Sequence, residues 1–331
     1  MNKNGTLHRA KRSKYDEFYT QLSDIENELR HYKRHFRGKT VYCNCDDPRV
    51  SNFWQYFALN FQRLGLKKLV TTCYKNQSAD LFSRHDSERA VMLEYKGYRD
   101  GENVPRPEDI GLTHLKGDGD FRSRECIEIL KEADIVVTNP PFSLFREYVA
   151  QLIEYDKKFL IVGHQNAMTY KDVFPLIQSN QLWLGRGFKR NCAHFIAPTY
   201  EDYASDADHR EGMIRVSGVM WFTNLDHAKR HEDLILYKRY SPGEYPKYDN
   251  YDAINVNYTS AIPEDYDGAM GVPITFLTKH NPDQFEILGA TESEGKGFSN
   301  GLWDADSGVA QPVVRGQRLY KRLFIRRKKD E

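Results

Sequence analysis

Residues 135–142, with the sequence IVVTNPPF, carry the strongest signal for the fold of this 331-residue chain. The first four residues are apolar or β-branched, a composition that favours a buried strand. The two prolines that follow can neither continue a central strand nor lie inside a helix, so we predict a stiff turn at Asn139–Pro140–Pro141–Phe142. In an open α/β sheet, ligands bind at the carboxyl ends of the strands. The sequence therefore predicts a functional site at this turn.

Strand-like and helical segments alternate on both sides of the turn. Strands are predicted at 40–45, 68–73, 135–138 and 159–163, and helices at 15–35, 51–64, 123–132 and 144–155. Strands that alternate with helices of ten or more residues indicate βαβ units, and hence an α/β fold with a doubly wound parallel sheet. Two later stretches, 214–216 and 219–223, are expected to be antiparallel strands that complete this sheet.

The amino-acid composition of the sequence changes near residue 227. Tyr, Asp, Asn, Gly and Pro dominate residues 240–271, and apolar positions lose their periodicity. We therefore predict two domains, 1–226 and 227–331, of which the second is smaller and irregular with short strands. Tyr245, Tyr248 and Tyr251 either line a groove of this region or pack in its interior.

The composition is that of a globular protein, with 40% hydrophobic residues, 29% charged residues and a net charge of +1. The apolar runs are too short to cross a bilayer, and the first residues contain no apolar leader segment. Five cysteines, an odd number without such a leader, favour a reduced, cytoplasmic protein. Neither the cysteines nor the eleven histidines have the spacing of metal ligands, so no metal is expected.

The turn has the chemistry needed to methylate an exocyclic amino group of a nucleobase. Such a nitrogen is a poor nucleophile because its lone pair is delocalised into the ring. The side-chain oxygen of Asn139 and the carbonyl of Pro140 could accept both N–H hydrogens, draw the nitrogen toward sp³ geometry and aim it at a sulfonium methyl group. Phe142 offers a face for stacking the base. The alternative is an ordinary turn between a strand and a helix.

The tetrapeptide resembles motif IV of the amino-methyltransferases. Four longer segments resemble the EcoRI-type adenine-specific DNA methyltransferases: YCNCDDPRVSN (42–52), DIVVTNPPFSLFR (134–146), YPKYDNYDAINVN (245–257) and MGVPITFL (270–277). The similarity extends from about residue 16 through nearly the whole chain. It implies a Rossmann-like catalytic core with a C-terminal DNA-recognition region, S-adenosylmethionine as cofactor and double-stranded DNA as substrate. It also implies methylation at N6 of an adenine flipped out of the duplex, and a role in a restriction-modification system or a phage.

The resemblance also assigns a cofactor site. It implies a cover segment before the first strand, a motif I after that strand, and an acidic motif III with an aromatic residue before the helix at 123–132. The residues assigned to the cofactor are Phe18, Tyr19, Thr20, Asn44, Asp46, Tyr74, Asp118, Asp120, Phe121 and Asn139. Two departures from the family pattern stand out: motif I has no Gly-x-Gly, and no acid follows the second strand. Asp47 is alternatively the N-cap of the helix predicted at 51–64.

Basic residues gather at three places. Residues 3–14 hold five Lys/Arg and no acid, residues 315–329 hold eight Lys/Arg and no acid, and residues 185–190 read GRGFKR. Once DNA is the expected partner, contact with phosphates is the favoured interpretation of the two terminal segments, and a solvated tail is the alternative. For residues 185–190, contact with phosphates or bases and a solvated basic turn are both left open. The residues predicted to bind DNA are Arg9, Lys11, Arg12, Arg186, Lys189, Arg190, Arg326, Arg327 and Lys328.

Two other functions are compatible with the turn. One is methylation of another planar amide or amine, such as a protein glutamine or an RNA adenine. The other is a catalytically silent DNA-binding protein that keeps the fold. The family resemblance further suggests GAATTC as a recognition sequence.

Overall fold

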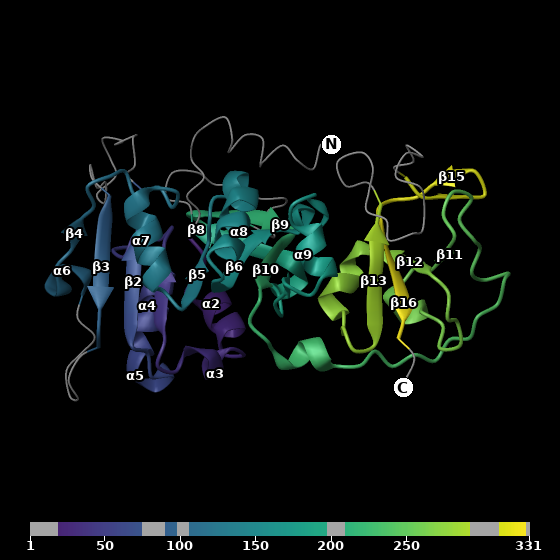
Figure 1. The fold of residues 1–331 in the computed structure, drawn as a ribbon, viewed down its shortest axis with the longest axis horizontal. Coiled ribbons are helices and arrows are strands. Elements are labelled where there is room, and N and C mark those ends of the chain that lie inside the picture. Colours follow the sequence, from purple (N-terminus) through teal and green to yellow (C-terminus); the bar gives the residue numbers. More distant parts are fainter. Residues whose placement is uncertain (1–18, 75–89, 98–105, 197–208, 292–310, 329–331) are drawn as a thin grey trace. The chain divides into compact units, whose positions relative to one another are not determined.

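The computed structural model describes residues 19–74, 90–97, 106–196, 209–291 and 311–328 (Figure 1). Phe18, Arg9, Lys11 and Arg12 lie outside these residues. The described residues form two units, the first within Met1–Gln165 and Gly185–Leu225, the second within Asn166–Leu184 and Asp226–Glu331. The expected domains 1–226 and 227–331 stay a prediction, and residues 166–184 cluster with the second unit.

The first unit is built on a mixed sheet with the strand order β4-β3-β2-β1-β5-β6-β10 (Figure 1). The strands are β1 (Thr40–Cys43), β2 (Lys68–Thr72), β3 (Val91–Tyr95), β4 (Thr113–His114), β5 (Ile135–Thr138), β6 (Lys158–His164) and β10 (Val219–Thr223). Strands β2, β1, β5 and β6 are parallel neighbours, so their carboxyl ends share one edge of the sheet. Strands β3 and β10 run antiparallel to β2 and β6. The predicted α/β fold is confirmed.

Helices cover both faces of this sheet. Helices α2 (Leu22–Leu29), α4 (Asn52–Leu59) and α5 (Phe61–Leu64) contribute to one apolar cluster with strand residues such as Val41 and Val137. Helix α8 (Phe145–Glu154) packs on the other face, where the Phe145 ring lies 5.0 Å from that of Phe222. Helix α7 (Arg124–Glu132) lies on that face too, with Cys126 next to Tyr42. Coverage on both sides explains why the central strands are apolar throughout.

The remaining helical segments are short. They are α3 (Lys33–Phe36), α6 (Pro107–Ile110), α9 (Phe174–Gln178), η1 (Phe142–Leu144), η2 (Gln165–Thr169), η3 (Lys189–Asn191), η5 (Ala228–His231), η6 (Thr259–Ala261) and η7 (Ile274–Lys279). None of the helices in the described part of the chain is long and apolar enough to span a membrane.

Three predictions for the first unit were wrong in detail. The helix expected at 15–35 begins only at Leu22, because Tyr19 forms a β-bridge with Ile196. The helix expected at 51–64 is interrupted at Asn60, and its N-cap is Ser51, whose hydroxyl accepts from two backbone N–H groups. Asp47 is therefore not the cap.

The third correction concerns the pair of antiparallel strands. Only β10 joins the main sheet. Strand β9 (Met213–Ser217) pairs instead with β8 (Cys192–Ile196) in a separate two-stranded sheet.

The second unit contains a four-stranded sheet of order β11-β12-β16-β13, in the region where the sequence predicts irregular structure with short strands. Its strands are β11 (Ile254–Asn255), β12 (Met270–Pro273), β13 (Phe285–Ala290) and β16 (Arg322–Arg327), and the unit also holds β7 (Trp183–Leu184), β14 (Val313–Val314) and β15 (Gln317–Arg318). The rings of Tyr248 and Tyr251 pack against Phe324 of β16, at 5.8 and 4.9 Å. Tyr245 is buried too, and its hydroxyl donates to the Ala261 carbonyl at 2.9 Å, so all three tyrosines are interior residues.

Strand β16 also corrects the interpretation of the basic C-terminal segment. Residues 322–327 form an inner strand of this sheet, paired on one side with β12 and on the other with β13. Leu323, Phe324 and Ile325 are fully buried. This part of the segment is therefore a core strand with basic ends, and it is no tail.

Candidate active site

The carboxyl edge of the parallel strands brings most of the predicted site segments together. Asn44 and Asp46 follow β1, Tyr74 follows β2, and the Asn139–Phe142 turn follows β5. Because β1 lies between β2 and β5, these three strand ends are neighbours.

Asp46 is buried at the centre of this edge. It is 5% exposed, and its carboxyl accepts hydrogen bonds from the Thr138 hydroxyl and, at 3.1 Å, from the Ser51 hydroxyl. Burial raises the pKa of Asp46 to about 7, although the hydrogen bonds from Thr138, Ser51 and the Asn139 backbone act in the opposite direction. The turn after β1 thus holds a buried acid in the segment that lacks the Gly-x-Gly expected of motif I.

Asn44 lies beside Asp46 and is only 2% exposed. Its side-chain oxygen accepts a hydrogen bond from the hydroxyl of Tyr148 on α8. Its side-chain nitrogen Nδ2 is buried and has no hydrogen-bond partner among the described residues. A buried polar group without a partner costs about 1–3 kcal/mol, so this N–H₂ group is a candidate donor to a bound molecule.

The predicted cover segment is fixed to two elements of the first unit. Tyr19 exchanges two backbone hydrogen bonds with Ile196 of β8, at 3.1 and 2.9 Å. The carbonyl of Thr20 accepts from Asn52 Nδ2 at 2.8 Å. The Thr20 hydroxyl is buried, and within the described part of the chain it has no hydrogen-bond partner. It is thus a second candidate for contact with a ligand.

The predicted motif III lies against the end of β2. Gly119 has φ +78°, and a Cβ at this position would lie 2.2 Å from the carbonyl oxygen of Cys73, so only glycine fits this approach. Tyr74, the next residue after Cys73, is 42% exposed. Phe121 is buried and packs edge-on against Tyr148, with the ring centroids 5.0 Å apart.

The two acids of motif III differ in their surroundings. Arg122 donates to both carboxylate oxygens of Asp120, from Nε at 2.9 Å and from Nη2 at 2.7 Å. These bonds lower the pKa of Asp120, so its carboxylate is ionised and can accept further hydrogen bonds. Asp118 is exposed, and its side chain accepts from the backbone N–H of Asp120 at 3.0 Å.

The Asn139–Phe142 turn leads from β5 through the 3₁₀ segment η1 into α8. Pro140 is buried, whereas Asn139, Pro141 and Phe142 are half-buried. The Phe142 ring lies edge-on to the buried Phe195 of β8, with centroids 6.4 Å apart. Strand β8 therefore contacts both the turn and, through Ile196, the cover segment.

The predicted DNA-binding loop is fixed by a buried acid. Glu28 on α2 accepts from the backbone N–H groups of Arg186 and Gly187, at 2.7 and 3.0 Å, and from the Tyr32 hydroxyl at 2.9 Å. The side chains of Arg186 and Lys189 are exposed, as phosphate contact would require. Arg190 belongs to η3 in the same loop.

The C-terminal DNA-binding candidates lie at the end of β16 in the second unit. Arg326 has a side chain 48% exposed, and its Nη1 is 3.9 Å from Glu286 Oε2. Arg327 is the last residue of β16, and the backbone N–H of Lys328 donates to Gln284 at 2.9 Å. The structure thus does not bring these residues together with Arg186 in one unit.

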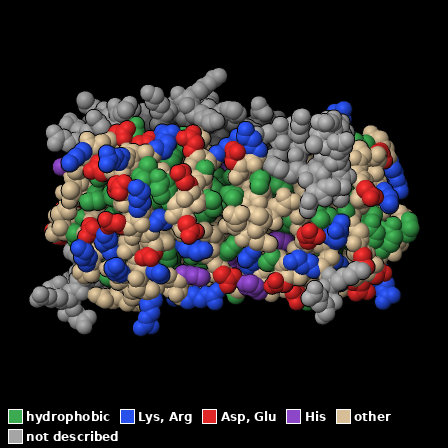
Figure 2. All heavy atoms as spheres, in the orientation of Figure 1, with side chains coloured by type: hydrophobic (Ala, Val, Ile, Leu, Met, Phe, Trp, Pro, Cys, Tyr) green, Lys and Arg blue, Asp and Glu red, His purple; other side chains and the backbone are tan. Residues whose placement is uncertain are grey.

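Positive charge does not gather into one patch on the face drawn in Figure 2. Figure 2 shows one face, on which Lys and Arg side chains are interspersed with Asp and Glu. No cluster of three His, Cys, Asp or Glu residues suited to a metal ion occurs in the ranges that the structure describes. Burial raises the pKa of the Cys43 and Cys45 thiols, as expected for cysteines with a packing role.

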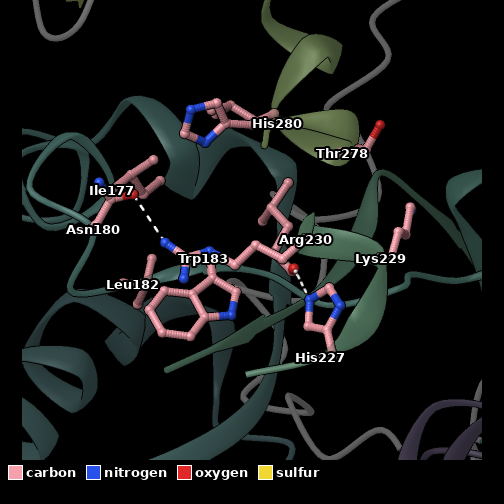
Figure 3. A pocket seen from close by; sticks show the side chains of 11 residues that line it. Ile177, Asn180, Leu182, Trp183, His227, Lys229, Arg230, Thr278 and His280 are labelled. Carbon is pink, nitrogen blue, oxygen red and sulfur yellow. Dashed lines mark hydrogen bonds between the residues drawn. The ribbon is translucent and has the colours of Figure 1, made fainter. Parts of the chain in front are cut away.

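The second unit has a recess of about 390 Å³, counted with the open space at its mouth, which contains none of the predicted site residues (Figure 3). Arg230 already has partners within the recess: it stacks on the Trp183 ring at 3.7 Å and donates to Asn180 Oδ1 at 2.9 Å. His227 Nε2 lies 2.9 Å from the carbonyl oxygen of Leu184. We interpret the recess as part of the packing of this unit.

Three residues of the site were missed by sequence reasoning: Thr138, Tyr148 and Phe195. Thr138 gave a usable signal, because it is the one polar residue in an otherwise apolar strand. Tyr148 is one aromatic residue in an amphipathic helix, and Phe195 lies in a strand that was not predicted.

The parallel strands, the helices on both faces and the Asn-Pro-Pro-Phe turn at the carboxyl edge define a Rossmann-like methyltransferase core. Residues 6–328 match the family described as adenine-specific methyltransferase EcoRI, and the chain belongs to this family.

Relatives of nearly equal length support this assignment. The chain is 49% identical to the Type II methyltransferase M.EcoRI of Escherichia coli, over 98% of this chain and 97% of the relative. It is 37% identical to the Type II methyltransferase M.MgeORF184P of Mycoplasma genitalium, over 97% and 98% of the two chains. It is 36% identical to the Type II methyltransferase M.MpnI of Mycoplasma pneumoniae, over 98% of each chain. No solved structure matches the chain.

Proposed function

We propose that this protein transfers the methyl group of S-adenosylmethionine to N6 of adenine in double-stranded DNA, acting in the cytoplasm as the modification enzyme of a restriction system or a phage. Family membership implies methyl transfer and an adenine acceptor. Duplex DNA is the acceptor that best fits its Type II methyltransferase relatives. The observation that carries the proposal is the Asn139 turn at the edge where β1 and β5 end side by side.

The residues at this edge fit S-adenosylmethionine. Asn44 Nδ2 and the Thr20 hydroxyl are buried polar atoms without a partner in the described residues, as expected for groups that bind a ligand. The ionised Asp120 would accept hydrogen bonds from the donor's adenine or ribose, and Phe121 would contribute apolar contact. When bound, the cofactor supplies an activated methyl group.

The residues of the turn would act on the acceptor. Asn139 Oδ1 and the Pro140 carbonyl would accept the two N–H hydrogens of the amino group and thereby free its lone pair for in-line attack. Phe142 would stack on the base, a contact worth about 1–3 kcal/mol. The target adenine would have to leave the duplex, at a cost of a few kcal/mol.

The test is methyl transfer by Asn139→Ala, with Gln55→Ala on the exposed side of α4 as the control. Asn139→Ala should lose more than 90% of the rate while DNA binding and thermal stability stay near wild type, because Asn139 orients the acceptor nitrogen. A variant that keeps more than a tenth of the wild-type rate would contradict the proposal.

The acceptor is tested separately. Wild-type protein and labelled S-adenosylmethionine are incubated with duplex DNA, structured RNA or a protein mixture, and the methylated product is identified. N6-methyladenine in DNA supports the proposal, whereas methylated RNA, methylated protein or binding without transfer each contradicts it. Mapping the modified adenines in a host genome would give the recognition sequence and test GAATTC.

A further inference from the structure

We propose that Asp46 and Thr138 form a positioning device that holds Asn139 in its catalytic orientation. The inference rests on the proposed function of Asn139. It assigns Asp46 a role different from direct cofactor binding, and it gives Thr138 a role for the first time.

The first step of the argument is the position of the Asp46 carboxyl. One oxygen, Oδ2, accepts from the Thr138 hydroxyl, and the other, Oδ1, accepts from the Ser51 hydroxyl at 3.1 Å. The backbone N–H of Asp46 donates to the Thr72 carbonyl at 3.1 Å. One residue therefore connects the ends of β1, β2 and β5 and the N-terminus of α4.

The second step concerns what this carboxyl can still bind. Asp46 is almost completely buried, both of its oxygens accept hydrogen bonds, and the Asn139 backbone N–H also faces it. Asn44, by contrast, has a buried N–H₂ group with no partner among the described residues. The two polar residues after β1 therefore differ in role: the N–H₂ group of Asn44 is available to a ligand, whereas the Asp46 carboxyl is bound by the protein itself.

The third step links Thr138 to catalysis. Thr138 is fully buried and immediately precedes Asn139, so its hydrogen bond fixes the last backbone unit before the catalytic side chain. Beyond it, two prolines restrict the chain. A displacement of about 1 Å in a reacting group can reduce a rate about 100-fold, so a contact at this point affects turnover without touching the substrate.

The test compares Thr138→Val, which keeps the shape but removes the hydroxyl, with Thr138→Ser, which keeps the hydroxyl. Single-turnover methyl transfer is measured at saturating S-adenosylmethionine and duplex DNA, and cofactor affinity is measured by calorimetry. Thr138→Val should lower the rate about 10- to 100-fold with cofactor affinity changed less than about twofold, whereas Thr138→Ser should stay within about threefold in both. Gln55→Ala, on the exposed side of α4 and away from the Asp46 carboxyl, is the control and should leave both the rate and the cofactor affinity at the wild-type level.

A double-mutant cycle separates positioning from general damage. In the Asn139→Ala background, Thr138→Val should change the residual rate less than about twofold, because the side chain that it positions is gone. An equal loss in both backgrounds, or a loss that lies entirely in cofactor affinity, would overturn the proposal. If Asn139→Ala alone retains the wild-type rate, the proposed function itself fails. If Asn139→Ala is inactive and Thr138→Val is fully active, only the present inference fails.

Discussion

The hydroxyl of Tyr148 donates a hydrogen bond to the side-chain oxygen of Asn44, across 104 positions of the sequence. This contact joins α8, the helix that follows the Asn139–Phe142 turn, to the end of β1. Burial raises the pKa of Tyr148 well above its usual range, so the hydroxyl keeps its proton at any working pH. Because the oxygen of the amide is engaged, its N–H₂ group is the part left for a ligand.

Replacing Tyr148 by Phe should weaken binding of S-adenosylmethionine by about 1–3 kcal/mol, because the amide of Asn44 then loses the contact that orients it. Calorimetry measures the affinity, and Tyr155→Phe at the C-cap of the same helix is the matched control. Equal affinities in Tyr148→Phe and wild type would show that Asn44 does not bind the cofactor in this way.

Asp120→Ala should also weaken cofactor binding, by about 1–3 kcal/mol, because it removes an ionised acceptor at the cofactor edge. Asp118→Ala is the control, since that acid is exposed two residues away. If instead Asp118→Ala weakens cofactor binding and Asp120→Ala binds the cofactor with wild-type affinity, the role belongs to Asp118.

The stability of the protein should depend on pH through Asp46. Its pKa is about 7 in the folded protein and 3.8 when unperturbed, so the unfolded chain releases this proton first. The contribution of the protonated acid to stability is complete below about pH 4 and is lost as the pH rises through about 7. About three pKa units at 1.36 kcal/mol each set an upper limit of about 4 kcal/mol.

Asp46→Asn removes this titration. Urea unfolding at pH 5 and pH 7.5 should therefore show that the variant, relative to wild type, becomes more stable at the higher pH. If the difference in unfolding free energy between the two proteins is the same at both pH values, Asp46 is already ionised in the folded protein at pH 5.

The salt dependence of DNA affinity should show which basic residues contact DNA, those of the 185–190 loop or those at the end of β16. If Arg186 and Lys189 contact phosphates, each change to Gln should reduce the slope of log affinity against log salt by about 0.9, on specific and random duplex alike. The same test applies to Arg326→Gln and Lys328→Gln, with Lys131→Gln on α7 as the control. A set whose variants keep the wild-type slope is solvated surface.

The sequence was sufficient to predict the centre of the first unit. Strands such as β5 and β6 are continuous apolar runs, and the prolines after β5 mark where the chain leaves the sheet. The position of the site followed from these features, because the ends of parallel strands share an edge. By contrast, β3 was missed although its residues alternate between buried and half-buried, since it lies apart from the βαβ pattern.

The second unit was harder to predict for a physical reason. In β16 three buried residues, Leu-Phe-Ile, lie between arginines, so that charge dominates the composition of the segment. The partners of this strand, β12 and β13, lie more than thirty residues earlier in the chain, and local patterns carry no information about such pairing. The Asp46–Thr138 contact spans 92 positions and was invisible for the same reason.

The place of β16 between β12 and β13 also sets the order in which the protein can be assembled during translation. The main sheet of the first unit needs nothing made after Thr223, so it can form on the ribosome while synthesis continues. Strands β12 and β13 are not neighbours and remain without their common partner until residues 322–327 have been made. A nascent chain stalled before that point would carry a folded first unit and an unfinished second unit with exposed strand edges, a natural target for chaperones and proteases.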